Sequence, residues 1–253
     1  MKMSGNTILI TGGGSGIGRA LAETFHALGN KVVIAGRRRS ALDETTKANP
    51  GMASLTLDIG DAESIRAFAK KATAEHPTLD VVIHNAGIMQ PENLAAPEID
   101  LTTAEATVAT NLLGPIRLNA ALLPHLRGRP QATIMTVSSG LAFIPLAMTP
   151  TYCATKAAIH SYSQSLRQQL KDTSVRVIEL APPYVQTELM GAQQASDPSA
   201  MPLKDFIAET IALLTNSPDA TEILVERVKP LRYAEANGNY PAVFAGLNSA
   251  FAH

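Results

Sequence analysis

The sequence predicts an α/β fold, a doubly wound parallel sheet of about seven strands with helices on both faces. Three observations lead to this prediction. Short runs rich in β-branched residues alternate with longer segments whose apolar residues recur at helical spacing. The short runs are continuously apolar, which is typical of parallel strands that are buried on both faces. A glycine-rich turn joins the first of these runs to the first helical segment.

Each element can be assigned from its own residue pattern. The predicted strands are residues 6–11, 31–36, 52–58, 79–87, 131–139, 174–180 and, as a short strand, 222–225. The predicted helices are about residues 17–28, 40–47, 64–75, 102–126, 150–171 and 203–215. Gly29 marks the end of the first helix, and Thr149 and Pro150 have the residue types of an N-cap and a first helical position.

The chain has no internal repeat, low-complexity linker or break in composition. We therefore expect residues 1–253 to form a single nucleotide-binding domain. Within it, residues 184–202 are expected to form a loop over a site, because they are irregular and polar. The extension at residues 222–253 is expected to form helices that either cover the site or contact another subunit.

Composition excludes several kinds of function. The net charge is −1, which gives no overall attraction to nucleic acid or to an anionic membrane. The single Cys153 excludes an intramolecular disulfide and cysteine-based metal clusters. No apolar run has transmembrane length, and the first residues lack the apolar core of a signal peptide, so a cytoplasmic location is expected.

The glycine-rich stretch TGGGSGIG, residues 11–18, follows the first predicted strand and begins the first helix. Glycines in this context let the backbone approach a pyrophosphate, which then lies at the positive end of the helix. A nucleoside-triphosphatase phosphate loop is excluded, because Arg19 and Ala20 stand where that motif needs Lys and Ser or Thr. The stretch predicts a Rossmann-like dinucleotide site.

The end of the second strand indicates which dinucleotide is bound. Folds that prefer NAD place an acidic residue here to bind the ribose 2′-hydroxyl, whereas this chain has Gly36 followed by Arg37 and Arg38. A guanidinium can bind a 2′-phosphate that a carboxylate would repel. The sequence therefore favours NADP(H) over NAD(H), with Arg37 as the main contact.

Tyr152 and Lys156 lie four residues apart near the start of a predicted helix, and thus on one face of it. A neighbouring ammonium is expected to lower the pKa of the tyrosine and so make proton exchange with an alcohol or carbonyl feasible. Ser139 lies thirteen residues upstream of Tyr152, at the end of the fifth strand, where doubly wound sheets bind ligands.

Together these motifs resemble the short-chain dehydrogenase/reductase family, in its one-domain branch of about this length. The glycine motif, NAG at 85–87, Asn111, Ser139 and Tyr152-x-x-x-Lys156 occur in the family's order, and the resemblance covers about residues 6–190. It implies that Tyr152 is the catalytic acid/base and that Ser139, rather than Ser138, orients the substrate oxygen. It also implies that Lys156 binds the nicotinamide ribose and that Asn111 holds a water in a proton relay.

The glycine motif and the resemblance together predict the cofactor contacts. They are Gly12, Gly14, Ser15, Gly16, Ile17, Gly18, Arg37, Arg38, Asp58, Ile59, Asn85, Ala86, Gly87, Tyr152, Lys156, Pro182, Val185 and Thr187. The alternative for Asp58 is an Asx-turn before the next helix. No metal site is expected, because His84 is better explained as a buried side chain and the other histidines lack ligand spacing.

The string PPYVQT at 182–187 departs from the family pattern, which has Pro-Gly after the sixth strand. Pro183 stands where glycine is expected, which fixes φ near −65° and removes an N–H donor. We expect Val185 and Thr187 to hold the nicotinamide carboxamide, and Tyr184 to turn toward the substrate.

The leading hypothesis is an NADP-dependent oxidoreductase that transfers hydride reversibly between nicotinamide and a carbonyl or alcohol. A non-catalytic nucleotide-sensing protein is the alternative from another class, and an epimerase or dehydratase of the extended branch is a third. A serine hydrolase is disfavoured, because the chain has no G-x-S-x-G motif. A small molecule is the expected partner, with residues 140–149 forming part of its pocket. The resemblance implies a homodimer or homotetramer with the helices near 102–126 and 150–171 at an interface.

Overall fold

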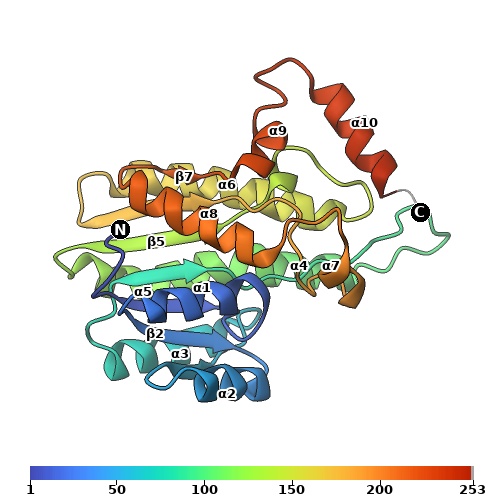
Figure 1. The fold of residues 1–253 in the computed structure, drawn as a ribbon. Coiled ribbons are helices and arrows are strands. Elements are labelled where there is room, and N and C mark those ends of the chain that lie inside the picture. The colour runs from blue at the N-terminus through green and yellow to red at the C-terminus, as the bar shows by residue number, and fades with distance from the viewer. Residues whose placement is uncertain (252–253) are drawn as a thin grey trace.

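The computed structural model describes residues 1–251 and has a central parallel sheet with helices on both faces (Figure 1). The strand order is β3-β2-β1-β4-β5-β6-β7, and every pair is parallel. The strands are β1 Thr7–Thr11, β2 Lys31–Gly36, β3 Ala53–Thr56, β4 Val81–His84, β5 Ala132–Val137, β6 Val175–Leu180 and β7 Glu222–Ile223. The predicted doubly wound α/β fold is confirmed.

The helices also lie close to where the sequence predicts them. They are α1 Gly16–Ala27, α2 Arg39–Ala48, α3 Ala62–Glu75, α4 Thr102–Val108, α5 Gly114–Arg127, α6 Pro150–Leu170, α7 Ala192–Ser196, α8 Leu203–Asn216, α9 Lys229–Arg232 and α10 Tyr240–Ala250. The chain is helical throughout 102–127, as predicted, although a π-helical turn at Ala109–Leu113 lies between α4 and α5. The short α7 lies in a segment that the sequence predicts as irregular.

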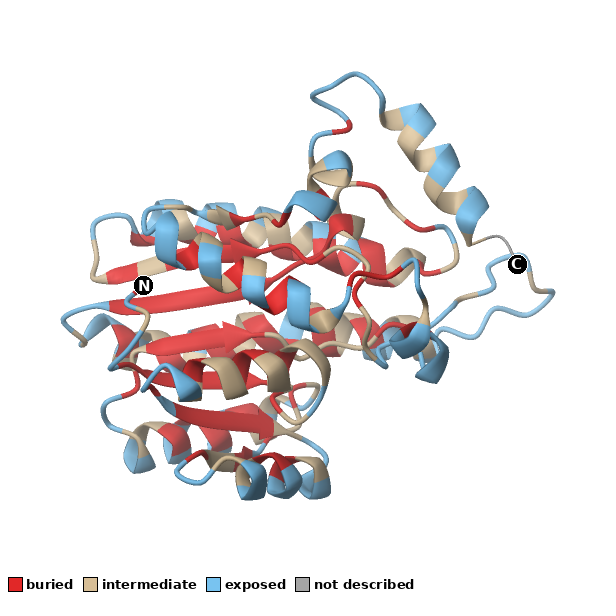
Figure 2. Ribbon diagram, in the orientation of Figure 1, coloured by how far each residue is buried: buried red, intermediate tan, exposed pale blue. Residues whose placement is uncertain are grey.

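The core has two halves, one on each face of the sheet (Figure 2). Alternate residues of each strand point to opposite faces, so Ile8 and Ile10 of β1 pack with α1 and α8, whereas Leu9 packs with α3 and α5. Such double burial explains why the strands read as continuous apolar runs.

The strand order reverses between β1 and β4, because the chain first winds outward to β3 and then returns to the other side of β1. In doubly wound folds the ligand-binding crevice lies at such a reversal, outside the carboxyl edge of the sheet. The glycine-rich stretch follows β1, and Asn85 follows β4. The topology therefore brings two of the predicted motifs together.

The C-terminal extension extends from the body and returns to it along α10 (Figure 1). Asn248 of α10 anchors this helix, since its side chain accepts from the N–H of Ala147 at 2.7 Å and donates to the carbonyl of Pro145 at 3.1 Å. Leu247 and Phe251 pack on a small apolar cluster that contains Leu146 and Tyr152. Of the two roles left open by the sequence, the extension thus has the first: it covers the predicted site.

Candidate active site

The turn between β1 and α1 needs glycine for two different reasons. Gly12 has φ +69°, a left-handed conformation that side chains rarely adopt. A side chain on Gly18 would overlap the carbonyl oxygen of Gly12 and the amide of Asn85. Ser15 is the N-cap residue of α1 but forms no side-chain cap, and the first turn carries no acidic residue. The positive end of this helix therefore fits an anionic group such as a pyrophosphate.

Asn85 and Thr11 hold the glycine turn in place. The Asn85 amide donates to the carbonyls of Thr11 at 3.1 Å and Gly12 at 3.4 Å. The Thr11 hydroxyl accepts from the backbone N–H groups of Asn85 and Ala86, both at 3.1 Å. The predicted NAG motif thus lies against the glycine turn, and its asparagine ties β4 to that turn.

The three arginines after β2 have different surroundings. Arg38 donates to the hydroxyl of Ser15 at 3.0 Å and so faces the glycine turn. Arg39 forms an ion pair with Asp43 at 2.8 Å on α2. Arg37 is exposed and has no ion pair or side-chain hydrogen bond within residues 1–251. Arg37 and Arg38 are therefore the two cations of this group whose positions suit a phosphate.

Asp58, at the end of the segment after β3, uses one carboxylate oxygen to accept from the N–H of Gly60 at 2.9 Å. This is the Asx-turn that the sequence offered as the alternative. The second oxygen remains available for a cofactor contact. Ile59 is buried beside α5, where its carbonyl leaves no room for a side chain at Gly114, so its side chain belongs to the core.

Ser139, Tyr152 and Lys156 come together from β5 and α6. The Ser139 hydroxyl lies next to Tyr152 and accepts from the N–H of Leu141 at 3.1 Å. The Lys156 ammonium lies 5.4 Å from the centre of the Tyr152 ring and donates to the Val137 carbonyl at 2.8 Å. All three side chains are at least nine-tenths buried. Ser138, by contrast, is buried outside this group.

Burial dominates the electrostatics of the pair. It raises the pKa of Tyr152 above its ordinary value, opposed in part by the hydrogen bond from Ser139. It lowers the pKa of Lys156 to about 8, and the charge of Glu179 opposes that change. In the protein alone the net change is therefore opposite to the lowered pKa that the sequence predicts for Tyr152, because loss of solvation is its largest cause. Tyr152 is held protonated.

Asn111 lies in the π-helical turn that interrupts the predicted long helix. Its side chain accepts from the N–H of Ile88 at 2.9 Å and donates to the Ile88 carbonyl at 2.8 Å. It also lies 3.4 Å from the hydroxyl of Thr155, which neighbours Lys156. π-Helical turns recur at functional sites because they re-aim a side chain, and here the turn aims Asn111 at the segment after β4.

The segment after β6 closes the site from the other side. The carbonyl of Pro182 accepts from the N–H of Gly140 at 2.8 Å, which joins this segment to the turn after Ser139. Thr187 lies against Gly16, whose added Cβ would sit 3.6 Å from it. Gln194 of α7, a residue with no sequence signal, donates to the Val185 carbonyl at 2.8 Å and to the Thr187 hydroxyl at 3.2 Å.

A pocket opens beside Ser139 and Tyr152. Its lining residues are Met89, Ser139, Gly140, Leu141, Leu146, Tyr152, Pro182, Pro183, Tyr184, Leu189, Met190, Gln194, Leu231, Leu247 and Phe251. Gly140, Leu141 and Leu146 come from the segment 140–149 that the sequence predicts to form part of the substrate pocket. Leu231, Leu247 and Phe251 could not be predicted, because they belong to the C-terminal extension, whose sequence carries no motif. None of the lining residues is charged.

His84, at the end of β4, has a structural role. His84 is buried and hydrogen-bonded to Asn119 at 2.7 Å, and burial lowers its pKa to about 4, so it is neutral. This agrees with its interpretation as a buried side chain.

Within residues 1–251, none of the helices combines the length and apolar character needed to cross a membrane.

With this geometry established, comparison with known proteins identifies the family. A family model described as short chain dehydrogenase matches residues 6–198. The chain belongs to the short-chain dehydrogenase/reductase family. As a member it is an oxidoreductase that acts on CH–OH and C=O groups and binds a nicotinamide dinucleotide.

Individual relatives agree with this assignment over nearly the whole chain. "Uncharacterized oxidoreductase DltE" of Bacillus subtilis (strain 168) is 40% identical, covering 98% of this chain and 99% of that protein. A short chain dehydrogenase from Burkholderia cenocepacia in complex with NADP has a TM-score of 0.80 at 24% identity, covering 98% and 99% of the two chains. One from Burkholderia phymatum in complex with NAD has a TM-score of 0.82 at 20% identity, covering 95% and 96%.

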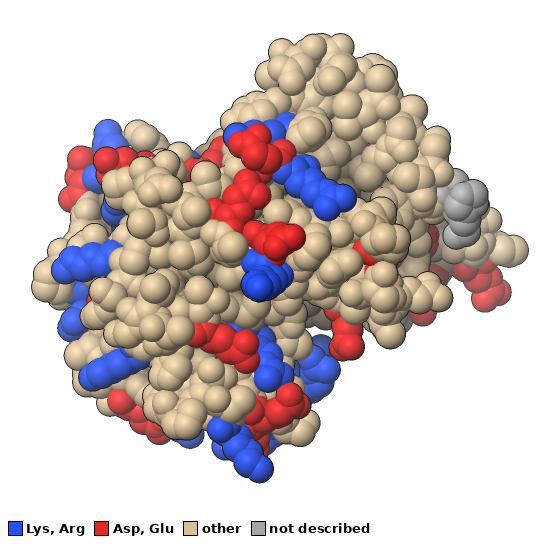
Figure 3. All heavy atoms as spheres, in the orientation of Figure 1, with Lys and Arg blue, Asp and Glu red and all other residues tan. Residues whose placement is uncertain are grey.

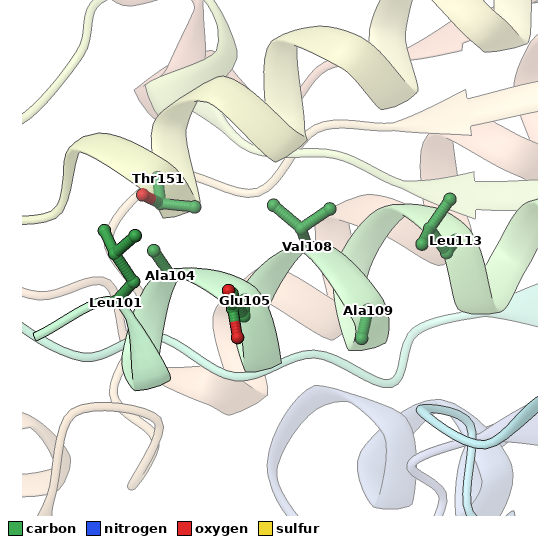
Figure 4. Close-up of a pocket in the computed structure, with 7 residues that line it drawn as sticks. All are labelled: Leu101, Ala104, Glu105, Val108, Ala109, Leu113 and Thr151. Atoms are coloured by element: carbon green, nitrogen blue, oxygen red, sulfur yellow. The ribbon is translucent and has the colours of Figure 1, made fainter.

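A second, shallower groove of this short-chain dehydrogenase/reductase lies on the outer face of α4 and the start of α6 (Figure 4). Leu101, Ala104 and Val108 point towards α6, from which Thr151 faces them. Leu101 and Leu113 are 57% and 37% exposed, which is unusual for leucine beside other apolar groups.

The buried ammonium of Lys156 leads to a prediction about stability. Its pKa falls from 10.5 to about 8 on folding, so keeping the charge costs about 3 kcal/mol at pH 7. Lys156→Met removes that cost, which is already net of the attraction to Glu179, but leaves the Val137 carbonyl without its donor, a loss of about 1 kcal/mol. We expect the variant to be about 2 kcal/mol more stable than the wild type at pH 7 in urea denaturation.

The stability difference should depend on pH. Between pH 8 and 10.5 the unfolded lysine holds a proton that the folded one has lost, so wild-type stability rises with pH and the difference narrows. Lys70→Met, at an exposed position of α3, is the matched control and should show no such dependence. A Lys156→Met variant less stable than wild type at pH 7 would contradict the prediction.

Proposed function

We propose that this short-chain dehydrogenase/reductase interconverts a carbonyl and an alcohol with NADP(H), using Tyr152 as general acid/base. One observation carries the proposal. Ser139 and Tyr152 line an uncharged pocket, and the segment after β6, which also lines it, continues to Thr187. Thr187 lies against Gly16 of the glycine turn. A carbonyl held in the pocket would thus lie between a proton donor and the dinucleotide site.

Each polar residue has a separate task in this proposal. The bound nicotinamide would supply or accept the hydride at the carbonyl carbon. The Ser139 hydroxyl would orient the carbonyl oxygen, and Tyr152 would donate its proton to that oxygen during reduction. Lys156 would offset the negative charge that develops on Tyr152, and Asn111 would hold a water in a relay that returns a proton.

The raised pKa of Tyr152 is consistent with a proton donor, because the hydroxyl stays protonated at neutral pH. Lys156, buried next to it, is the cation available to stabilise the phenolate as it forms. Thr187, with Val185 and Pro182, would hold the carboxamide, and Tyr184 lines the substrate pocket.

Replacing Tyr152 with Phe should separate an enzyme from a nucleotide-sensing protein. The variant loses the transferable proton but little else, so turnover should fall by about 10²–10⁴ while cofactor affinity is retained. The measurement is NADPH oxidation over a panel of neutral aldehydes and ketones, with cofactor affinity from fluorescence titration. Cofactor binding without turnover in the wild type would favour the sensing alternative.

The proposed preference for NADP(H) rests on the arginines after β2. The fold alone does not decide it, since one structural relative binds NADP and another binds NAD. Arg37 is an exposed cation at the end of β2, and Arg38 is hydrogen-bonded to Ser15 in the glycine turn. No acidic side chain directly follows β2, so no carboxylate there would repel a 2′-phosphate.

Arg37→Ala should weaken the binding of NADPH and leave the binding of NADH unaffected. Loss of a charge-assisted hydrogen bond of about 1.5–3 kcal/mol should raise KM for NADPH about 10-fold or more. Arg39→Ala is the matched control, because Arg39 is paired with Asp43. Equal losses with NADPH and NADH, or a wild type that prefers NADH, would contradict the assignment.

We propose a substrate that is uncharged and apolar near its carbonyl. The lining is mainly Leu, Met, Pro and Phe, and burying a charge there without a partner would be costly. The chain from 236 to 251 carries no Asp, Glu, Lys or Arg, and the upper lobe in Figure 3 accordingly shows no charged atoms. Elsewhere on this face, acidic and basic side chains are interspersed.

We propose that a second copy of the chain covers the groove on α4 and α6. Both helices belong to the predicted interface, and the exposed leucines give it apolar area to bury. Residues 1–253 are proposed as a single domain, which the one continuous sheet supports. The cytoplasmic location stays a prediction.

Leu113→Arg should dissociate the assembly. A charge in the middle of an apolar contact is left without a partner, so the mass measured by analytical ultracentrifugation should fall to that of a smaller species. Leu94→Arg is the control, because Leu94 is 56% exposed and lies outside the groove. A wild type that sediments as a monomer at micromolar concentration would refute the proposal.

A further inference from the structure

A polar stripe runs along α6 away from the pocket. Tyr152, Lys156, His160 and Gln164 follow one another at intervals of four, and such residues share one face of a helix. Tyr152 and Lys156 are buried, His160 is partly buried and Gln164 is exposed. The stripe thus connects the buried pair of the active site with the surface.

Glu179 of β6 faces this stripe with a fully buried carboxylate, only 1% exposed. The Nδ1 atom of His160 lies 3.0 and 2.8 Å from its two oxygens, and Nε2 lies 2.9 Å from the amide nitrogen of Gln164. The ring can donate through Nδ1 to the carboxylate and accept through Nε2 from the amide. A carboxylate buried this deeply also needs a cation nearby.

Lys156 is placed to be that cation. Its ammonium donates to the carbonyl of Val137 on β5, and Glu179 lies opposite the preceding residue, Thr136, in the pairing of β5 with β6. Burial disfavours the ammonium, whereas the negative charge of Glu179 favours it. The two buried residues therefore interact electrostatically near the carboxyl ends of β5 and β6.

The other charged groups near Glu179 are Glu222 and Arg232, and the pKa of Arg232 is raised mainly by its hydrogen bonds to Glu222 and to a smaller extent by the charge of Glu179. Glu222 of β7 accepts from Arg232 of α9 at 2.9 and 3.1 Å. Arg232 also lies 4.7 Å from the centre of the Phe143 ring. His160, Glu179 and Glu222 are close enough to hold a metal ion, but Arg232 already binds both oxygens of Glu222. The cluster is better explained as a charge network than as a metal site.

We propose that Glu179 is a positioning residue for Lys156: its buried carboxylate, held by His160 and Gln164, keeps Lys156 positively charged beside Tyr152. The proposal rests on the roles proposed above for Tyr152 and Lys156. It adds a residue from outside the pocket, whose effect on the reaction passes through the lysine alone.

Glu179→Gln tests this directly, because glutamine has the same shape and can still accept from His160. Without the negative charge Lys156 loses its proton more readily. The alkaline limb of kcat/KM for carbonyl reduction should then move to lower pH by about one pH unit. Activity should recover when the pH is lowered, which a merely structural defect would not allow.

Glu222→Gln is the matched control, a carboxylate of the same cluster that is paired with Arg232 instead. Its pH profile should follow the wild type. The double variant His160→Gln/Glu179→Gln, in which two amides can bond to each other, provides the same test if the single variant does not fold.

A second readout is independent of turnover. The ¹³Cε resonance of Lys156, assigned with Lys156→Arg, reports the charge of its ammonium in the protein without cofactor. We expect it to titrate at lower pH in Glu179→Gln than in the wild type and in Glu222→Gln. Identical titrations in all three would overturn the proposal even if Tyr152→Phe is inactive; a displaced titration supports it even if the proposed reaction fails.

Discussion

Removal of the Lys156 ammonium from water is the constraint on which the rest of the site depends. A cation at the end of a sheet, 6% exposed, must be held by fixed oxygens, and the protein supplies them from its framework. The Val137 carbonyl comes from β5, and the Glu179 charge comes from β6. Both strands lie in the middle of the core, so these groups cannot turn away from the lysine. Burial also keeps Tyr152 protonated, and the Lys156 ammonium lies 5.4 Å from the centre of its ring.

The framework around this pair is rigid where the dinucleotide would bind. Thr11 and Asn85 join the ends of β1 and β4 through four hydrogen bonds, and the glycine turn is packed so closely that Gly18 leaves no room for a side chain. A rigid turn presents the N-terminus of α1 without reorganisation, which is the condition for binding an anion efficiently. Gln194 continues this bracing on the other side, since it holds Val185 and Thr187 at once.

The fold could be predicted from the sequence because continuous apolar runs and helical periodicity are local signals, and the motifs follow them along the chain. The placement of Ser139 beside Tyr152 followed from strand and helix ends. Three features could not be predicted. The π-helical turn at Asn111 depends on contacts with Ile88 across the fold. The direction in which the pKa of Tyr152 is shifted depends on burial, which the four-residue spacing of Tyr152 and Lys156 does not reveal. Glu179 reads as one polar residue in an apolar strand, and only the register of β6 brings it to His160 and Lys156.

Pro183 and the C-terminal extension together explain how the pocket is divided. One side of the pocket, formed by the segment 182–184, is fixed. The Pro182 carbonyl accepts from the N–H of Gly140, and Pro183 restricts the backbone φ angle and lacks an N–H donor. The opposite side is formed by α10 and Phe251, which follows it. α10 has no fully buried residue and is anchored through Asn248. The ring centres of Tyr184 and Phe251, from the two sides, lie 5.3 Å apart. Changes in α10 would therefore alter the lining of the pocket without disturbing β6, which carries Glu179, or the turn after β5, which carries Ser139. In the proposed reaction, residues of α6 beside the sheet transfer the proton, and the extension that lines the pocket contributes to the choice of substrate.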